Sequence, residues 1–380
     1  MRSIIDIVGK KIDVLLQCGD KAQAMEVALG AAQQYPNLIE LQHIVESVRS
    51  RRAKIAFFCG LDGVNFLRDI GMYAKGRFNV HFFEGSTPEE MYELMKWSDI
   101  SWFEWCTDMA TTASNLPKVC KTIVRLHRYE AYTHWPMEIK WENIDTLVTI
   151  GNDFVRNRLR SVVSGIENRT QIVEIPNGIN LTKFKFAERP RGKNIAFICN
   201  LNMKKNPAFM LQCFNSLLSI DPEYKLFWAG KIQDVVVEQY MRYMVGELGL
   251  CNRVFFDGWH EDINIWLANK HFIVNSSIVE GHPVGVMEGM ACGIKPVIHN
   301  FPGAKQFFPE EFLYNSTEEF CDKIISSDYE PRRYRRFIED KYPLSGQLRQ
   351  VNRLFVEFEK NSCSSMAQGA HVAAAGIGYG

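Results

Sequence analysis

The chain has 380 residues, of which 46% are hydrophobic and 23% are charged. These values are typical of a globular protein of two to three domains and exclude wholesale disorder. The 44 Lys and Arg residues balance the 44 Asp and Glu residues, which argues against a nucleic-acid-binding protein, because such proteins carry a marked basic excess.

No stretch approaches the roughly 18 uninterrupted apolar residues that a membrane-spanning helix needs. No signal peptide is visible, since Asp6 interrupts the first apolar segment. The ten cysteines are scattered without a Cys-x-x-Cys pair, and several lie in apolar runs, where a free thiol packs as a small hydrophobe. We therefore expect a cytoplasmic protein in a reducing compartment.

Residues 1–52 show apolar side chains at helical spacing, and Gly19 and Pro36 separate three predicted helices. The spacing of these two residues and of Ala24 and Ala28 resembles one tetratricopeptide unit. One such unit cannot bury its own apolar face. Two interpretations remain open: a helical cap that packs on the next domain, or a partner-binding module.

From residue 53 onward, short β-rich runs alternate with helical segments, which is typical of parallel sheets covered on both faces. The predicted strands form two series: 54–59, 78–83, 99–105, 122–127, 145–150 and 171–176, then 194–199, 224–230, 253–258, 271–276 and 295–299. A charged linker at 186–193 separates the series. We therefore expect an α/β fold with two doubly wound, Rossmann-like domains, residues 53–185 and 186–342, that face a cleft.

The last residues of the chain fall into two segments of different composition. Residues 343–360 predict an amphipathic helix from Leu344 to Glu359 that packs back toward the N-terminal domain. Residues 361–380 are mostly Ser, Ala and Gly, and this composition predicts a disordered tail.

The segment from 280 to 297 carries the clearest chemical signal. It follows a predicted strand and places Pro283 near the first turn of a helix, which is a helix-start signal. The backbone N–H groups of residues 281–284 would then form a helix N-terminus, a ready site for phosphate. Glu280 and Glu288 lie beside it. Two acids at such a place are electrostatically costly unless they accept hydrogen bonds from sugar hydroxyls.

This segment resembles the Glu-x7-Glu motif of retaining glycosyltransferases with the two-domain GT-B fold, particularly glycosyltransferase family four. Residues 173–184 are similar to the family's Pro-Asn-Gly signature, with Asn180 where Asp is usual. Residues 199–207 resemble its Gly-Arg…Lys loop, and residues 255–277 resemble the stretch before the motif. The resemblance covers about residues 54–360.

The resemblance implies that a hexosyl or N-acetylhexosaminyl group moves from a nucleotide diphosphate sugar to an acceptor hydroxyl, with retention of anomeric configuration. It places Glu280 at the donor sugar and Glu288 at the nucleotide ribose. Lys205 would neutralise the leaving phosphate. The turn that cradles the diphosphate consists of Gly281, His282, Pro283 and Val284.

The sequence departs from the family pattern at Asn200, where the family usually has an arginine that contacts the diphosphate. A charge-assisted contact of this kind contributes about 1.5–3 kcal/mol. Lys204 and Lys231 are the candidate replacements.

No Asp-x-Asp motif occurs in the chain. Transferases of the other common fold use that motif to hold a divalent cation across the diphosphate. Its absence fits a metal-independent site in which Lys205 and the helix start stabilise the leaving charge. We therefore expect no metal and no other cofactor.

The first domain would supply the acceptor side, and four residues at predicted strand ends are candidates. His127 matches a position where relatives often have a histidine near a sugar, or it is a hydrogen-bonded structural histidine. Glu130 receives the acceptor proton or forms a surface salt bridge. Glu104 lies in the aromatic cluster 102–105, which stacks on a sugar or packs in the core. Gly63 belongs to an acceptor loop or a tight packing turn.

The expected partners are a nucleotide sugar and a glycan, lipid-linked or protein acceptor, without nucleic acid. The basic runs 49–54 and 332–336 are solvated faces or dock on the inner face of an anionic membrane. Such docking would make the protein peripheral on that membrane.

Two other functions remain open within the same fold. One is a phosphorylase or an epimerase-like nucleotide-sugar enzyme. The other is a catalytically weak GT-B protein that binds a nucleotide sugar or a partner, which Asn200 and the N-terminal helices suggest.

Overall fold

The computed structural model describes residues 2–60 and 63–374, and it divides into two compact units. Unit 1 contains the chain up to Thr149, Arg158–Ile175, and the segment from Leu348 onward. Unit 2 contains Ile150–Asn157 and Pro176–Gln347. The predicted domain boundary between residues 185 and 186 thus falls inside unit 2. Each unit holds one six-stranded sheet.

The sheet of unit 1 is parallel, with the strand order β2-β1-β3-β4-β5-β6. Its strands are β1 (Lys54–Phe58), β2 (Asn79–Phe82), β3 (Ile100–Phe103), β4 (Lys121–Leu126), β5 (Thr146–Thr149) and β6 (Gln171–Glu174). The connecting helices include α4 (Arg68–Lys75), α5 (Pro88–Trp97), α6 (Asp108–Asn115), α7 (Trp135–Glu138) and α8 (Asp153–Val162). Thr87 begins α5 with a capping box, in which its side chain accepts from the Glu90 N–H and Glu90 reaches back to the Thr87 N–H.

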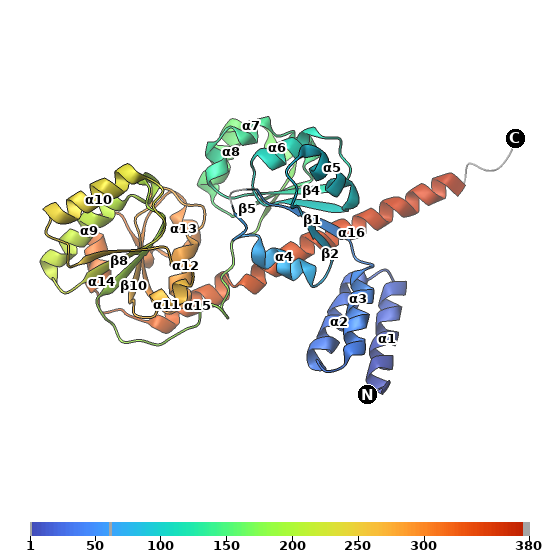
Figure 1. Cartoon of the computed structure of the whole chain (residues 1–380), viewed down its shortest axis with the longest axis horizontal. Coiled ribbons are helices and arrows are strands. Elements are labelled where there is room, and N and C mark those ends of the chain that lie inside the picture. Colours follow the sequence, from blue (N-terminus) through green and yellow to red (C-terminus); the bar gives the residue numbers. More distant parts are fainter. Residues whose placement is uncertain (1, 61–62, 375–380) are drawn as a thin grey trace. The chain divides into compact units, whose positions relative to one another are not determined.

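Unit 2 repeats this plan with the parallel strand order β12-β11-β10-β7-β8-β9. Its strands are β7 (Asn194–Ile198), β8 (Lys225–Ala229), β9 (Val254–Gly258), β10 (Phe272–Asn275), β11 (Lys295–His299) and β12 (Leu313–Tyr314). Its helices are α9 (Pro207–Ile220), α10 (Val235–Glu247), α11 (Ile263–Leu267), α12 (Val284–Ala291), α13 (Ala304–Phe307), α14 (Thr317–Ile325) and α15 (Pro331–Lys341). Helices cover both faces of this sheet (Figure 1).

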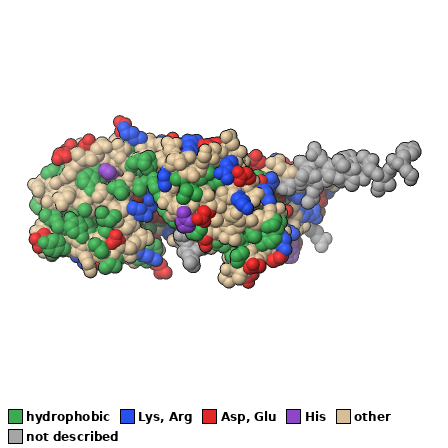
Figure 2. Space-filling view, turned by 90° about the horizontal axis from the view of Figure 1, so that it is seen from above, with side chains coloured by type: hydrophobic (Ala, Val, Ile, Leu, Met, Phe, Trp, Pro, Cys, Tyr) green, Lys and Arg blue, Asp and Glu red, His purple; other side chains and the backbone are tan. Residues whose placement is uncertain are grey.

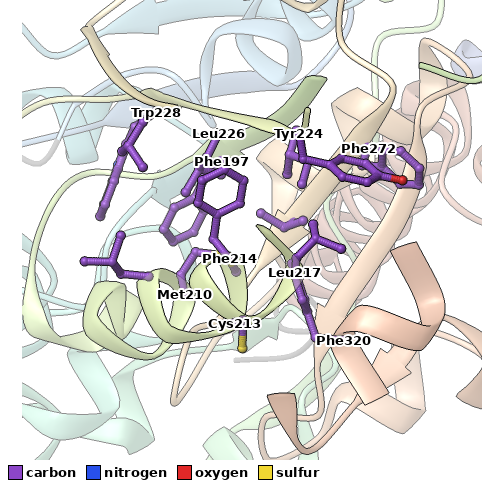
Figure 3. Packing of buried hydrophobic residues seen from close by; sticks show 14 of the residues in the cluster. Phe197, Met210, Cys213, Phe214, Leu217, Tyr224, Leu226, Trp228, Phe272 and Phe320 are labelled. Carbon is purple, nitrogen blue, oxygen red and sulfur yellow. The ribbon is translucent and has the colours of Figure 1, made fainter. Parts of the chain in front are cut away.

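The two faces of the unit 2 sheet have separate hydrophobic cores. On one face, Phe197 and Trp228 of the sheet meet Met210 and Phe214 of α9, together with α10 and α14 (Figure 3). On the other face, Ile273 and its neighbours pack against α11, α12, α13 and α15. Burial on both faces explains why the strands appear in the sequence as continuous apolar runs.

The strand order of unit 2 places the ends of β7 and β10 side by side. Phe197 pairs with Val274 in the parallel register. Strand β8, which follows β7 in the chain, lies on one side of β7, and β10 lies on its other side. This is the topological switch point of the sheet. Ligands of open parallel sheets bind at the carboxyl ends of the strands at such a point.

The N-terminal helices α1 (Arg2–Gln17), α2 (Lys21–Gln34) and α3 (Ile39–Arg49) have a hydrophobic cluster of their own. Asp20 caps α2 by accepting a hydrogen bond from the Gln23 N–H at 3.0 Å. An ion pair of 3.0 Å between Arg77 and Glu26 connects this helical cluster to the segment that follows α4.

The last helix, α16, runs from Leu344 to Ala374. Its Val351, Leu354, Phe355 and Phe358 pack into the same cluster as the β1 and β3 side chains of unit 1. The helix continues past residue 361, where the sequence predicts disorder, since the segment holds no proline and is rich in alanine, the strongest helix former. Residues 375–380 lie outside the described part of the chain.

All eleven predicted strands are present, and the predicted α/β class with two doubly wound sheets is confirmed. Strand β12 was not predicted, because its two residues carry no recognisable strand pattern. Within residues 2–60 and 63–374, no helix combines the length and the apolar character that a membrane crossing requires.

Candidate functional site

Lys205 lies in a short turn that follows β7. The residues Met203–Lys205 form one 3-10 turn, and Asn206 then adopts φ 48° and ψ 53°. This left-handed conformation is uncommon outside glycine, and asparagine tolerates it better than most residues. Pro207 starts α9 directly afterwards. The turn therefore fixes Lys205 at the carboxyl end of β7.

Glu280 holds the Lys205 ammonium. Lys205 Nζ lies 2.5 Å from Glu280 Oε1, and only 9% of the glutamate side chain is exposed. Ser277 Oγ donates to the same oxygen at 2.6 Å, and Asn275 Nδ2 lies at 3.5 Å. The carboxylate is thus oriented by three donors at the switch point.

The backbone also joins the two loops. Ser276 Oγ donates to the Lys205 carbonyl at 2.7 Å, and the Ile278 N–H donates to the Lys204 carbonyl at 3.0 Å. The loop after β7 and the loop after β10 therefore form one hydrogen-bonded structure, which holds Lys205 and Glu280 in place before any ligand binds.

The helix after Glu280 begins as predicted, with Pro283 at the N-cap of α12. The expectation that the N–H groups of residues 281–284 all face a ligand needs correction. Proline has no N–H, and the Val284 N–H donates to the His282 carbonyl at 2.8 Å. Gly281 and His282, the other two residues of this turn, are both buried.

Asn152, which the sequence analysis did not single out, supports the Glu280 turn within unit 2. Its Nδ2 donates to the Glu280 carbonyl at 2.8 Å and lies 3.3 Å from the Pro302 carbonyl. Its Oδ1 accepts from the Phe154 N–H at 2.9 Å, at the start of α8. Gly303 must lack a side chain here, because a Cβ would lie 2.4 Å from Asn152 Oδ1.

His282 packs in the aromatic layer below this turn. Its ring centroid lies 4.7 Å from that of Phe307 and 4.8 Å from that of Tyr342, and the side chain is 7% exposed. The packing of the imidazole therefore fixes the backbone turn of residues 281–283.

Glu288, just over one turn into α12, lies in an environment that disfavours its charge. Burial raises the pKa of its carboxyl to about 7, and nearby Lys183 only partly opposes this effect. A carboxylate that is costly when unliganded gains most from a ligand that donates hydrogen bonds to it.

Asn200, which stands where the family pattern has arginine, joins the loop after β7 to the loop after β8. Its Oδ1 accepts from the Lys231 N–H at 3.0 Å. The neighbouring Gly230 has φ 153°, and a Cβ there would lie 2.0 Å from the Cys199 carbonyl oxygen. Lys231, a candidate replacement for the arginine, places its Nζ 4.8 Å from the ring centroid of Trp259.

A pocket of about 290 Å³ opens at the carboxyl ends of β8 and β9. The loop that carries Lys205 contributes Leu201 to its wall, and Trp259, 57% exposed, contributes an aromatic ring. Lys205 is the fourth residue after Leu201, so their Cα atoms lie at most about 14 Å apart. The full lining is Leu201, Trp228, Gly230, Lys231, Ile232, Glu238, Arg242, Phe256, Gly258 and Trp259.

In unit 1, a buried network of charges occupies the carboxyl ends of β3 and β4. Glu104 Oε1 lies 3.0 Å from both Arg125 Nη1 and His127 Nε2, and Trp102 Nε1 donates to Oε2 at 2.9 Å. Burial opposes ionisation of Glu104, but Arg125, His127 and Trp102 together lower its pKa. Glu104 is therefore a buried carboxylate that anchors His127.

Two further acceptor-side candidates adjoin this network. Trp105 packs on the His127 ring with a centroid distance of 4.3 Å, and its Nε1 donates to the Gly63 carbonyl at 3.1 Å. The Gly63 loop therefore has a packing contact, whereas Leu61 and Asp62 lie outside the described residues. Helix α4 follows this loop and starts at Arg68.

Glu130 is fully buried, and burial raises the pKa of its carboxyl. Its Oε1 accepts from the His127 N–H at 3.1 Å and lies 3.5 Å from the Cys106 nitrogen. The carboxyl thus stabilises the loop that carries it. Its role as acceptor of the proton stays a prediction.

The basic runs find partners within the chain. Arg52 Nε lies 2.9 Å from Glu359 Oε1 in a buried pair, and Arg49, Arg332 and Arg333 pair with Glu46, Glu188 and Glu311. Arg335 donates to the carbonyls of Phe184 and Ala291. Acidic and basic side chains are interspersed on the face shown in Figure 2. Arg332 and Arg333 are nevertheless 71% and 43% exposed, and docking of these runs on an anionic membrane stays a prediction.

Comparison with solved structures establishes the architecture. HepE from Anabaena in complex with UDP and glucose is 14% identical and has a TM-score of 0.63 over 80% of this chain and 100% of its own. Sucrose-phosphate synthase from Thermosynechococcus elongatus is 15% identical, with a TM-score of 0.64 over 80% of this chain and 99% of its own. This chain has the GT-B fold.

Sequence comparison gives matches to part of the chain. Residues 179–342, less than half of the chain, match the family described as glycosyl transferases group 1. A GDP-mannose:cellobiosyl-diphosphopolyprenol alpha-mannosyltransferase from Xanthomonas campestris is 23% identical over 164 residues, which are 42% of this chain. The chain spans 40% of the length of this curated relative.

The structure brings the donor-side candidates together in unit 2: Lys205 and Glu280 touch, and the turn 281–284 follows directly. The acceptor-side candidates Gly63, Glu104, His127 and Glu130 gather in unit 1. Ser277, which orients Glu280, was not predicted from the sequence. Its position three residues before that glutamate, directly after a predicted strand, was the available signal. In the described parts of the chain, no group of three or more His, Cys, Asp or Glu side chains could hold a metal ion.

Proposed function

We propose that this GT-B protein is a retaining glycosyltransferase of family four that uses a nucleotide diphosphate sugar as donor, with residues 280–288 as its Glu-x7-Glu motif. The contact between Lys205 and Glu280 carries the proposal, because it sets a cation and an oriented carboxylate beside the N-terminus of α12 at the switch point of the donor sheet. A diphosphate needs positive charge and N–H donors, and a sugar needs hydrogen-bond acceptors.

Lys205 stabilises the leaving diphosphate in this mechanism. Negative charge grows on the phosphate oxygen as the bond between it and the sugar anomeric carbon breaks. An ammonium group already held in place lowers the energy of this transition state more than that of the bound donor. The N–H groups of Gly281 and His282 and the positive end of α12 add to this field.

The two glutamates bind different groups of the donor. Glu280, oriented by Ser277 and Asn275, accepts hydrogen bonds from the donor sugar and acts as an orienting group rather than a nucleophile. Glu288 accepts from the ribose hydroxyls, which compensate for the burial that raises its pKa. The pocket beside Leu201 and Trp259 holds the nucleobase, since an exposed aromatic ring offers a stacking face.

We propose that the reaction needs no divalent metal, because Lys205 and the N-terminus of α12 supply the positive charge that a bound cation supplies elsewhere. The departure from the family pattern at Asn200 removes one cation from this site. Lys231 does not replace it in this structure, since its ammonium lies over Trp259.

The acceptor side is assigned to unit 1. The relative from Xanthomonas acts, by its name, on a cellobiosyl-diphosphopolyprenol, and we propose a lipid-linked glycan as the acceptor class. His127, held by Glu104 and Trp105, is the acceptor-side residue that we assign to the acceptor or the donor sugar. Transfer of a hexosyl or N-acetylhexosaminyl group would serve glycan or glycoconjugate biosynthesis.

A catalytically weak binding protein is the second candidate, and the Asn200 hydrogen bond to the Lys231 N–H favours it. The side chain that replaces the usual cation serves the loop instead of a phosphate. Such a protein would bind a nucleotide sugar without turning it over.

Purified full-length protein incubated with UDP-, GDP- and ADP-sugars tests the proposal. Nucleotide release, with a lipid-linked saccharide as acceptor, is expected for at least one donor, and NMR of the product should show the anomeric configuration of the donor. Binding without release under every acceptor would support the binding protein. Conversion of the sugar nucleotide without an acceptor, or phosphate dependence, would indicate an epimerase or a phosphorylase.

A further inference from the structure

The wall of the pocket at the ends of β8 and β9 contains a carboxylate and a guanidinium side by side. Arg242 Nε and Nη2 both lie 2.9 Å from Glu238 Oε1. Glu238 Oε2 and Arg242 Nη1 take no part in this pair. The side chains are 19% and 55% exposed. The pocket therefore presents one acceptor group next to one donor group.

The rest of the pocket suits a flat ring. Trp259 offers an exposed indole, and Lys231 Nζ lies over it. Arg242 is itself positioned by Phe256, since its guanidinium carbon lies 4.7 Å from that ring centroid. The volume of about 290 Å³ exceeds that of one nucleobase.

The three common bases differ in what they present to such a pair. Guanine presents two adjacent donors, the ring N1–H and the exocyclic amine, with the O6 acceptor next to them. Uracil presents one N–H between two carbonyl oxygens, and adenine presents an amine next to an acceptor nitrogen. A carboxylate only accepts and a guanidinium only donates. Two donors beside one acceptor are therefore the complement of Glu238 and Arg242.

We infer that Glu238 makes this pocket selective for guanine, so that the donor is a GDP-sugar. The inference rests on the proposed function, which places the nucleobase here. Glu238 accepts from guanine N1–H and its exocyclic amine, and Arg242 donates to O6. Uracil in the same place would set a carbonyl oxygen against the Glu238 carboxylate.

Isothermal titration of the full chain with GDP and with UDP tests this selectivity. A hydrogen bond to a charged group contributes about tenfold to a hundredfold in affinity. Wild type should therefore bind GDP at least tenfold more tightly than UDP. Glu238→Gln should weaken GDP binding by at least tenfold and should not weaken UDP binding, because the amide removes the repulsion between the carboxylate and a uracil carbonyl oxygen.

Two further variants separate base recognition from general damage. Glu247→Gln changes an exposed carboxylate on the same helix, outside the pocket lining, and should leave both affinities unchanged. Glu238→Asp keeps the charge on a shorter arm and should retain a preference for GDP. The melting temperature of each variant shows whether the chain remains folded.

The outcomes distinguish this inference from the function on which it rests. Equal affinity for GDP and UDP, a preference for UDP, or an equal loss of both in Glu238→Gln would overturn guanine selection and leave nucleotide-sugar binding standing. Failure of every nucleotide diphosphate to bind the folded wild-type chain would overturn the proposed function as well.

Discussion

The ammonium of Lys205 and the carboxylate of Glu280 lie 2.5 Å apart, at the ends of two neighbouring parallel strands. A buried carboxylate needs a partner, and Lys205 supplies it in this structure. A diphosphate that enters beside α12 would compete for the same ammonium. Donor binding should then free the Glu280 carboxylate to accept from the sugar hydroxyls. The same ion pair thus positions the cation for the diphosphate and the carboxylate for the sugar.

The raised pKa of Glu288 predicts an unusual dependence of stability on pH. Its carboxyl has a pKa of about 7 in the folded protein, against an ordinary value of 4.5. The folded state therefore holds the proton more tightly. The associated stability is fully present below about pH 4.5 and is lost as the pH rises to about 7.

Replacement by a neutral amide removes this dependence. Relative to wild type, Glu288→Gln should gain up to about 3 kcal/mol between pH 4.5 and pH 8. Urea unfolding of both proteins across this range measures the difference. A constant difference between them would show that the Glu288 carboxyl titrates normally.

Gly230 should be intolerant of any side chain. A Cβ there would lie 2.0 Å from the Cys199 carbonyl oxygen, and φ 153° is itself unfavourable for other residues. We expect Gly230→Ala to destabilise the protein by more than about 2 kcal/mol. Denaturant unfolding measures the loss.

Gly246 offers a matched control, because it lies in α10 and nothing approaches its Cβ position within 4 Å. Gly246→Ala should stabilise the helix by about 0.5–1 kcal/mol. Similar effects of the two substitutions would contradict the close approach of the two loops.

Much of the fold follows from local pattern, since strands buried on both faces are continuous apolar runs and Gly293 ends its helix with φ 84°. Lys205 and Glu280 were identified because each follows a strand within a recognisable motif. Asn152 was not found, because it acts across 128 residues of sequence on the Glu280 carbonyl. The pocket around Trp259 was also missed, since three strand ends build it and no single segment carries its pattern.

The Glu104 network should be essential for the stability of unit 1. Glu104→Ala would leave Arg125, which is 1% exposed, without this carboxylate. Removing one partner from a buried ion pair costs about 3–5 kcal/mol. Thermal unfolding should show this loss, whereas Glu310→Ala, which removes an exposed partner of Lys305, should cost less than about 1 kcal/mol.

Equal stability of the two variants would show that the Glu104 network contributes little. Glu104→Gln should retain sugar transfer that Glu104→Ala loses, because glutamine keeps a hydrogen-bonding group for His127. This result would show that the hydrogen bond to His127 matters more than the charge of Glu104.

The buried pair of Arg52 and Glu359 joins the start of the first sheet to α16, across 307 residues of sequence. Glu359 Oε1 also accepts from the Ala53 N–H at 2.7 Å. Glu359→Ala should therefore destabilise the protein by about 3–5 kcal/mol. Hydrogen exchange should show faster exchange in α16 and β1. Unchanged exchange in both elements would contradict this anchoring.

The turnover of Lys205→Ala, with the donor that the wild type uses, tests the central claim most directly. A loss of kcat by about a hundredfold to a thousandfold is predicted, with the fold intact by circular dichroism. Lys305→Ala, which removes an exposed lysine elsewhere in unit 2, should keep the wild-type rate. A folded Lys205→Ala protein that transfers sugar at the wild-type rate would contradict the assignment of this ammonium to the leaving diphosphate.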